Sequence, residues 1–469
     1  MKLVPIEMQY KEGVKNKDAK DYADSIGRLP YILINGVTIE NPDVEYFKLF
    51  NDRYLPEIEM TFKDPTNKIF DAQYPLDQQL LSIFIKANSD LLQPIRMDFY
   101  IIKFDAIKSD GGDSEDKTYE LKAQLNVPFY IQNTSNKGNS YDVLQKIASQ
   151  IDLGFASNIE KTNDEMTWIN CGIDFIREQV PEIVKRSYID DNTFTWAYVD
   201  FYYNLNYIDI EKQIQETTKD SSTLSGTEKL DGKQSLLPLI LSNHPDKNST
   251  NLYIDKYNLV NNSTEVNFNL GYQPYIYYYD TTSKNLSSVK LDPISSKGDK
   301  NNLIVMKGQP QDNNYNLNQH KNYFLGKVDE SNSHINYLYS EKLNEHNMEF
   351  FQKIRMSINL PNVNFQLYRF QPVNIEIYKL RELDSNENPV TKKDVETAKN
   401  TDKYKLNERL SGDWVIIGIN YTYMKPKPKR GKDKPPGKMI QEVIVAKREL
   451  TAIGERDSAG THDSWSNGS

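Results

Sequence analysis

The chain has 469 residues, of which 38% are hydrophobic and 26% are charged, and its formal net charge is −9. This length favours about two to four domains. The acidic balance argues against a protein whose main task is to grip nucleic acid, although it suits a surface that nucleic acid passes without adhering. The single cysteine, Cys171, excludes an intrachain disulfide and is interpreted as a small buried apolar residue.

Neither a membrane span nor a secretion signal is expected. No apolar run reaches the roughly 18 residues that a transmembrane helix needs. The N-terminal sequence MKLVPIEMQYKEG lacks the apolar core of a signal peptide. We therefore expect a soluble chain that is made in a cytoplasm.

Residues 1–29 are charged and poorly patterned, which indicates an arm that orders on a partner. Residues 30–127 then show a β pattern. Asn35-Gly36 between apolar runs predicts a hairpin, and later runs alternate apolar and polar residues. The segment LDQQLLSIFIKAN interrupts this pattern and is expected to be a short helix or an extended loop. The whole region predicts an antiparallel sheet curled into a small barrel or sandwich.

Residues 128–206 predict an α/β domain. A helix should begin with Ser140 as its N-cap and be closed by Gly154. A second helical pattern runs from Trp168 to Val180, where Pro181 should kink or interrupt it. The aromatic run from Trp196 to Tyr207 predicts one long strand.

The rest of the chain predicts a second β region around an insertion. Residues 207–215 and 349–453 should form a second barrel, because runs such as KIRMSINLP and MIQEVIVAKREL alternate regularly. Residues 216–348 form an irregular insertion that includes the extended aromatic run GYQPYIYYYD, and residues 454–469 a polar tail. The predicted fold class is α+β, mainly β.

The order of several patterns resembles one known family. NSYDVLQKIASQIDLGFASN, MTWIN, KRSYIDDNTF and YVDFYYNLNYI, followed by GYQPYIYYYD, HINYLYSEKLNEHNMEFFQKIRMSINLP and LSGDWVIIGINYTY, are similar to the baseplate central hub proteins of contractile-tailed bacteriophages. The same hub architecture is found at the start of type VI secretion spike proteins. The likeness covers about residues 30–450, and only the second half of the insertion carries the family pattern.

The resemblance implies a structural protein of the virion baseplate, assembled in the host cytoplasm. It implies a homotrimer with two tail-tube-like barrels in each protomer, so that three copies form a pseudo-sixfold ring. Implied partners are the tail tube or a tube-initiator protein, a trimeric puncturing spike and other baseplate proteins. DNA would pass through the central channel without specific binding. Because this chain ends soon after the second barrel, we expect the spike to be a separate chain.

Two alternatives stay open. The helix pattern SYDVLQKIASQIDLG faintly resembles glycan-binding modules of the LysM type, which would suit a peptidoglycan-binding or lytic tail protein. It also suits a helix buried against a sheet, and no readable pair of carboxylates supplies the acid and nucleophile of a glycosidase. A hub of a non-viral contractile injection system would perform the same physical task as a phage hub.

One basic segment is a candidate contact with a partner. It holds seven basic residues and one acidic residue between two strands, and the basic residues are Lys425, Lys427, Lys429, Arg430, Lys432, Lys434 and Lys438. Three interpretations stay open for this segment: it is a solvated hairpin loop, it contacts an acidic neighbour in the tail, or it contacts nucleic acid. The last is weakened by the absence of interleaved aromatic residues.

Three tryptophans are predicted structural anchors. Trp168 and Trp196 should fix the layers of the α/β domain, and Trp414 should lie in a core or between barrels. No catalytic residue, metal site or cofactor is expected. The spacing of the five histidines matches no metal signature, and His334 suits a role in the fold or an interface. The acidic run at 110–117 departs from the EF-hand pattern and suits a hairpin tip.

Overall fold

The structure is a computed structural model that describes most of the chain between residues 30 and 447. The segments outside the description are 1–29, 41–42, 66–68, 70–78, 86–94, 109–116, 129–134, 170–177, 192, 214–226, 231–232, 237–239, 244–252, 271, 282, 292–319, 329–332, 335, 362, 364–366, 381–403, 426–436 and 448–469. The predicted arm, the polar tail, Cys171 and nearly all of the acidic run at 110–117 therefore lie outside the described residues.

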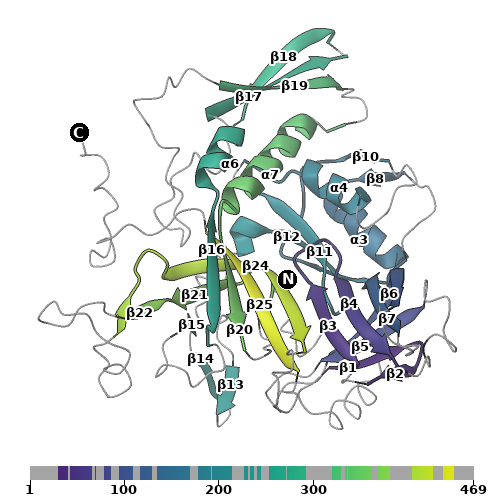
Figure 1. The fold of residues 1–469 in the computed structure, drawn as a ribbon. Helices are drawn as coiled ribbons and strands as arrows, with labels where there is room; N and C mark the ends of the chain where they lie inside the picture. Colours follow the sequence, from purple (N-terminus) through teal and green to yellow (C-terminus); the bar gives the residue numbers. More distant parts are fainter. Residues whose placement is uncertain are drawn as a thin grey trace, which may run out of the picture.

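The centre of the molecule is a 13-stranded sheet (Figure 1). Its path runs β16-β20-β25-β24-β3-β4-β7-β6-β5-β1-β2, with β21 paired to β24 and β15 to β21. The strands are β1 (Tyr31–Ile34), β2 (Val37–Ile39), β3 (Val44–Phe50), β4 (Glu57–Asp64), β5 (Leu80–Ile85), β6 (Ile95–Lys108), β7 (Lys117–Leu125), β15 (Ile240–Ser242), β16 (Lys256–Asn261), β20 (Ile354–Leu360), β21 (Pro372–Glu376), β24 (Gly412–Met424) and β25 (Lys438–Lys447).

The mainly β, α+β class is confirmed. Both predicted β regions are present, and they join edge to edge through β3 and β24. Among the described strands no pairing closes either half into a barrel, so the two barrels stay a prediction. The predicted domain boundaries likewise remain predictions.

Alternation builds the sheet as expected. Ile58, Met60 and Phe62 on β4 are at most 1% exposed, and they face the core together. The hairpin at Asn35-Gly36 is confirmed, with φ angles of 46° and 83° that suit its tight turn.

The helix or loop expected around residues 76–88 is wrong at its centre. Residues 80–85 form β5, which pairs with β1 and β6. The segment LLSIFI reads as continuous rather than alternating because Leu81 to Ile85 are all buried. A strand covered on both faces loses the period-two signal.

In its described residues, the α/β unit comprises two small sheets and two helices. Strands β9 (Gly154–Ser157), β11 (Thr195–Val199) and β12 (Asn204–Asp209) form one sheet, and β8 (Asn136–Gly138) pairs with β10 (Met166–Trp168). Helices α3 (Ser140–Gln150) and α4 (Val180–Arg186) pack into the core cluster that also contains the main-sheet residues.

Several local predictions in this unit are wrong. Asn139 is the N-cap of α3, because its side chain accepts from the amide of Asp142, while Ser140 is fully buried. The helix ends at Ile151 and Asp152 adopts a φ of 58°, so Gly154 is free to begin β9.

The second helical pattern is wrong at its start. Trp168 lies on a strand, and Pro181 stands in the first turn of α4, where a missing N–H is harmless. Residues 170–177 lie outside the described part of the chain.

The aromatic run folds as a hairpin rather than one long strand. Strands β11 and β12 pair antiparallel, and Asp200 organises the turn between them by accepting from the amides of Tyr202 and Asn204. Aromatic and β-branched residues predict extended backbone but carry no signal for this reversal.

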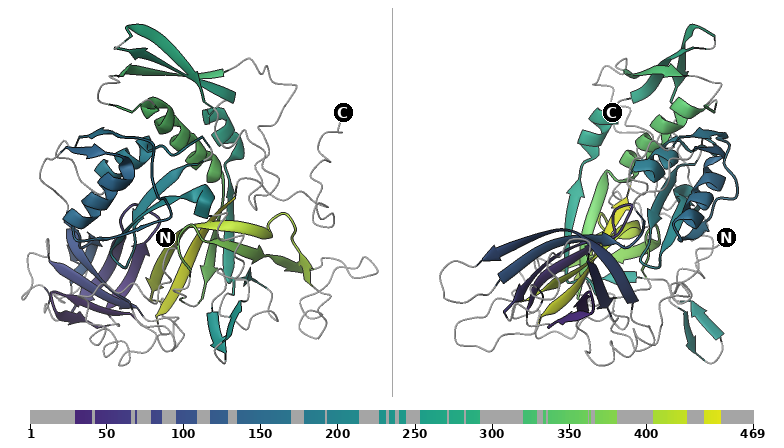
Figure 2. Two further views of the ribbon diagram at one scale, coloured as in Figure 1. Left: turned by 180° about the vertical axis from the view of Figure 1, so that it is seen from behind. Right: turned by 90° about the vertical axis from the view of Figure 1, so that its right-hand side faces the viewer.

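Part of the insertion adds an upper layer (Figures 1 and 2), while its strands β15 and β16 belong to the main sheet. Strands β17 (Tyr272–Asp280), β18 (Asn285–Lys290) and β19 (His320–Val328) form a sheet beyond helices α6 (Ser263–Leu270) and α7 (Tyr337–Phe351). The extended run GYQPYIYYYD is thus confirmed as a strand. Two further pairs are β13 (Thr227–Leu230) with β14 (Lys233–Leu236) and β22 (Tyr378–Leu380) with β23 (Tyr404–Leu406). No described helix is both long and apolar enough to cross a bilayer.

Candidate functional site

The junction between β3 and β24 joins the two halves of the main sheet, and we call it the seam. Tyr421 pairs with Leu49, and the register continues to Met424 opposite Tyr46. The rings of Phe47 and Tyr423 stack with centroids 5.6 Å apart. Residues almost four hundred positions apart in sequence therefore share one continuous ladder and one core.

A polar cluster crosses the seam beside this apolar pair. Glu442 of β25 accepts a hydrogen bond from Ser357 Oγ at 2.7 Å and one from Asn420 Nδ2 at 3.3 Å, and its Oε2 lies 2.9 Å from Lys48 Nζ of β3. Asn420 Oδ1 also accepts from the amide of Asn51 at 3.0 Å. Burial acts to raise the pKa of Glu442, but the bonds from Ser357, Lys48 and Asn420 outweigh it, so the pKa lies below its usual range.

A buried arginine ties the seam to the α/β unit. The guanidinium of Arg369 donates to the carbonyls of Ile417 at 3.0 Å, Arg53 at 2.7 Å and Asp52 at 3.4 Å. It also lies 4.3 Å from the ring centroid of Tyr198 on β11. Burial lowers the pKa of Arg369 to about 10, which leaves it charged at neutral pH. One side chain thus contacts both half-sheets and the α/β unit.

The three tryptophans that were predicted to be structural anchors lie in different parts of the fold. Trp414 is fully buried and donates from Nε1 to the Leu410 carbonyl at 3.0 Å. Trp168 is 3% exposed and donates to the Gly138 carbonyl at 2.9 Å. Trp196 is half-buried and stacks on Tyr54, with ring centroids 4.7 Å apart. It therefore links β11 to the loop between β3 and β4.

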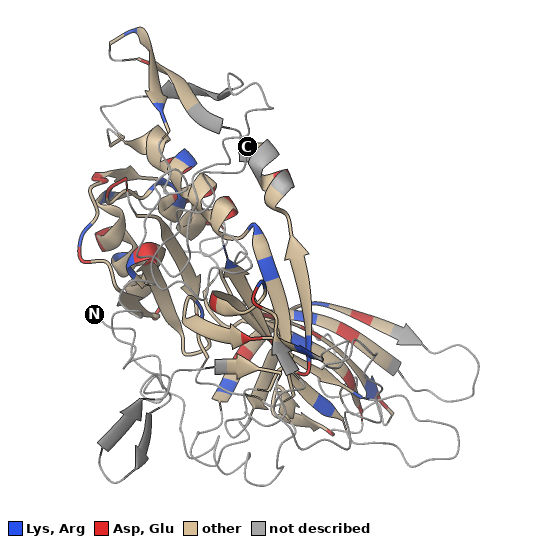
Figure 3. Ribbon diagram, turned by 90° about the vertical axis from the view of Figure 1, so that its left-hand side faces the viewer, with Lys and Arg blue, Asp and Glu red and all other residues tan. Residues whose placement is uncertain are grey.

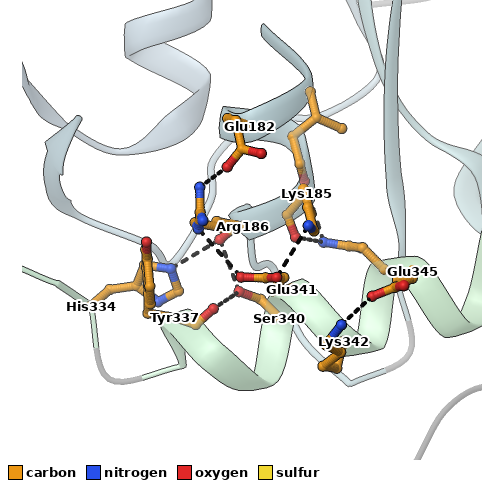
Figure 4. A network of polar contacts seen from close by, with 11 residues as sticks. Glu182, Lys185, Arg186, His334, Tyr337, Ser340, Glu341, Lys342 and Glu345 are labelled. Carbon is orange, nitrogen blue, oxygen red and sulfur yellow. Dashed lines mark hydrogen bonds and ion pairs between the residues drawn. The ribbon is translucent and has the colours of Figure 1, made fainter. Parts of the chain in front are cut away.

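A second polar joint connects the insertion to the α/β unit (Figure 4). Arg186 at the end of α4 pairs with Glu182 in the same helix, and its Nε lies 3.5 Å from Glu341 of α7. Lys185 Nζ lies 3.1 Å from Glu341. His334 Nε2 donates to the Arg186 carbonyl at 2.9 Å. Burial lowers the pKa of His334, although this hydrogen bond opposes the shift.

Side chains of α7 also satisfy the last carbonyls of α4. Asn344 Nδ2 donates to the carbonyls of Val184, Lys185 and Ser187 at 3.3, 3.1 and 2.9 Å. Ser340 Oγ donates to the Arg186 carbonyl at 2.9 Å. A helix leaves its final four carbonyls without intrahelical partners, so these contacts cap α4 from a distant part of the chain.

The basic segment is described only at its ends. The amide of Lys425 donates to the Glu45 carbonyl at 3.0 Å, and Lys438 Nζ lies 3.6 Å from Asp255. The other five residues lie outside the described part, namely Lys427, Lys429, Arg430, Lys432 and Lys434. Charges of both signs intersperse over the described strands (Figure 3). The partner of this segment stays a prediction.

The glycan-binding reading of the first helix gains no support from its packing. Val143, Leu144 and Ile147 of α3 are at most 2% exposed. Ser140 Oγ donates to Asp164 Oδ2 at 2.6 Å inside the core. One face of the helix is buried in the core, as its alternative reading expected, and the opposite face is exposed. Among the described residues, no group of His, Cys, Asp and Glu side chains is arranged to hold a metal ion.

Comparison with known proteins gives matches at the level of structure alone. No protein-family model and no curated protein matches the sequence. The tail protein from Neisseria meningitidis MC58 is 10% identical, with 89% of this chain and 96% of that chain covered and a TM-score of 0.47. The 43 kDa tail protein of prophage MuSo2 from Shewanella oneidensis is 7% identical, with 90% and 99% covered and a TM-score of 0.45.

A chain of the lidless PdpA–VgrG complex is 12% identical, with 89% of this chain and 64% of that chain covered and a TM-score of 0.43. These neighbours include tail proteins, and the resemblance of the sequence to baseplate hub proteins stays a prediction. The likeness to the solved structures concerns the fold.

Sequence reasoning missed the polar residues of both joints. Most partners of Arg369, Glu442 and Asn344 lie far away in sequence, with Ser357 85 positions from Glu442, Val184 160 positions from Asn344 and Asp52 317 positions from Arg369. Glu442 shares one face of β25 with Ile440 and Ile444, and nothing in this alternating run indicates its partners. The alternation within one strand does not indicate which other strands lie near it in the sheet, so the contact between Lys48 of β3 and Glu442 of β25 could not be predicted.

Proposed function

We propose that this chain is the structural hub of a contractile-tail baseplate and acts without catalysis. In this proposal three copies form a ring with pseudo-sixfold symmetry. One face of the ring docks the hexameric tail tube or its initiator, and the other carries a trimeric spike. The channel lets the genome pass once the spike has left, and the chain's net charge of −9 discourages DNA from adhering to the wall.

The observation that carries the proposal is the seam. A trimer meets a sixfold tube only if each protomer supplies two comparable tube-facing units at a fixed relative angle. Here two β regions, separated by the α/β unit and the insertion, are joined through four paired positions from Tyr421–Leu49 to Met424–Tyr46. The buried Arg369 and the Glu442 cluster then fix the halves against each other.

The stoichiometry is testable directly. Light scattering on the purified chain, alone and with the spike protein of the same particle, should give three copies in the complex. A mass of one copy under both conditions contradicts the ring. Electron microscopy of the complex with tail-tube protein should show the hub between tube and spike.

The lytic alternative has its own measurement. A turbidity assay on purified cell walls should show no clearing by this chain, and clearing would refute the non-catalytic part of the proposal. A hub of a non-viral injection system shares the same physical task, and whether capsids accompany the purified particles separates it from a phage.

A further inference from the structure

Strand β16 is an edge strand at one end of the main sheet, and its free edge and both of its faces are accessible among the described residues. It pairs with β20 over six residues without a bulge, and among the described strands β20 is its only neighbour. Both of its faces are largely exposed, and Tyr257 and Val260 are 40% and 39% exposed. It has no proline, and Lys256 is its one charged residue. Edge strands without such protection readily accept another strand.

The apolar face of the sheet is incompletely covered at β16. Tyr257 pairs with Ile358 and Leu259 with Met356, and both β20 residues are fully buried. Leu259 is only partly covered by the main core, and Tyr257 is 40% exposed. One more strand with apolar residues at alternate positions would complete the covering of this face.

The opposite face of the same two strands is polar and basic. Lys256 and Asn258 lie there, opposite Asn359 and Ser357, and Arg355 is exposed beside Val260. A strand that continued the sheet would therefore need polar, preferably acidic, residues at the positions between its apolar ones.

The N-terminal arm contains a segment with this pattern. In residues 6–10 the apolar Ile6, Met8 and Tyr10 alternate with Glu7 and Gln9. If this segment lay beside β16, Ile6, Met8 and Tyr10 would lie on the same face of the sheet as Tyr257 and Leu259. Glu7 and Gln9 would then lie on the opposite face, where the Glu7 carboxylate is on the same side as Lys256 and Arg355. Shifting the segment by one residue would reverse both matches.

We propose that residues 6–10 of one copy add a strand to the β16 edge of the neighbouring copy. This inference rests on the proposed ring. The arm leaves the sheet at β1, which is nine strand intervals from β16, or roughly 43 Å along the sheet. In a closed head-to-tail ring, the end of the sheet formed by β1 and β2 of one copy faces the β16 end of the next, so the arm meets its neighbour's edge before its own.

Disulfide trapping between two different chains tests this exchange. Cys171 is the only cysteine, so C171S provides a cysteine-free background. One chain carries Met8→Cys and the other carries Tyr257→Cys or Leu259→Cys, and the two are co-expressed with different tags. The matched control moves one cysteine to the other face, as Met8→Cys with Val260→Cys. Gln9→Cys with Val260→Cys restores the match.

The expected result is a disulfide-linked pair of differently tagged chains for the three same-face combinations and its loss for the mismatched one. When both cysteines of a same-face combination are placed in one chain, cross-linking only within single chains overturns the exchange between copies. A trimer by light scattering without any cross-link overturns the arm proposal and leaves the proposed ring standing. A monomer without any cross-link overturns both.

Discussion

The ammonium of Lys48 lies 2.9 Å from the carboxylate of Glu442, and this contact reaches across the whole width of β24. Lys48 pairs with Thr422 on one side of that strand, and Glu442 pairs with Asn420 on the other. The first half of the sheet is therefore clamped to β25 as well as to β24. Both side chains are about three-quarters buried, at 26% and 22% exposed, which limits screening by solvent.

Acid should loosen the seam through Glu442. Its folded-state pKa lies below the ordinary value of 4.5, so its stabilisation is fully present above that value and is lost as pH falls through the folded pKa. Glu442→Gln should lower the free energy of unfolding at pH 7 by about 1–3 kcal/mol and flatten its decline below pH 4.5.

Urea titrations between neutral and acidic pH measure this effect. Glu59→Gln is the matched control, because its ion pair with Lys122 lies on the more exposed surface, with side chains 39% and 57% exposed. Equal pH profiles for wild type and Glu442→Gln would show that the clamp contributes nothing.

Removing the buried guanidinium should destabilise the chain more than any exposed arginine does. Arg369→Met leaves the carbonyls of Ile417, Arg53 and Asp52 without this donor in the interior, at a cost of about 2–4 kcal/mol. Arg369→Lys keeps the charge but loses the planar fork, so it should recover only part of that loss. Arg355→Met, at the exposed position of β20, is the control. Thermal unfolding that ranks Arg369→Met with Arg355→Met would contradict the role given to Arg369.

The joint between α7 and α4 should open locally before the molecule unfolds. Asn344→Ala removes the donor shared by the carbonyls of Val184, Lys185 and Ser187, which should cost about 1–3 kcal/mol. Hydrogen exchange should then rise in α7 and at the end of α4 while β24 and β25 keep their protection. Glu345→Ala, on the exposed side of α7, should leave exchange unchanged. A uniform rise across the sheet would mean that Asn344 supports the global fold instead.

Alternation along single strands predicted most of the main sheet, because Met60, Leu121 and Met356 each signal their buried face locally. The same logic failed at β5, where both faces are covered, and at Asp200, where one carboxylate reverses an aromatic run. Alternation along a strand could not predict the long-range polar contacts. Nothing near Arg369 in sequence indicates that its partners are the carbonyls of residues 52 and 53.

The tryptophans should separate into two classes on truncation. Trp414 is fully buried and Trp168 nearly so, so changing either to Ala should lower the free energy of unfolding by roughly 3–5 kcal/mol. Trp196 is half-buried, and its main described ring contact is Tyr54. Trp196→Ala should therefore cost less, about 1–3 kcal/mol.

Its effect should also depend on Tyr54. A double-mutant cycle with Tyr54→Ala isolates the ring pair, and a coupling of about 0.5–1.5 kcal/mol is expected for stacked aromatics. Trp414→Ala combined with Tyr54→Ala should be additive, because Trp414 shares no described ring contact with Tyr54. Coupling of the same size in both cycles would mean that Tyr54 acts through the fold as a whole rather than through its stacked neighbour.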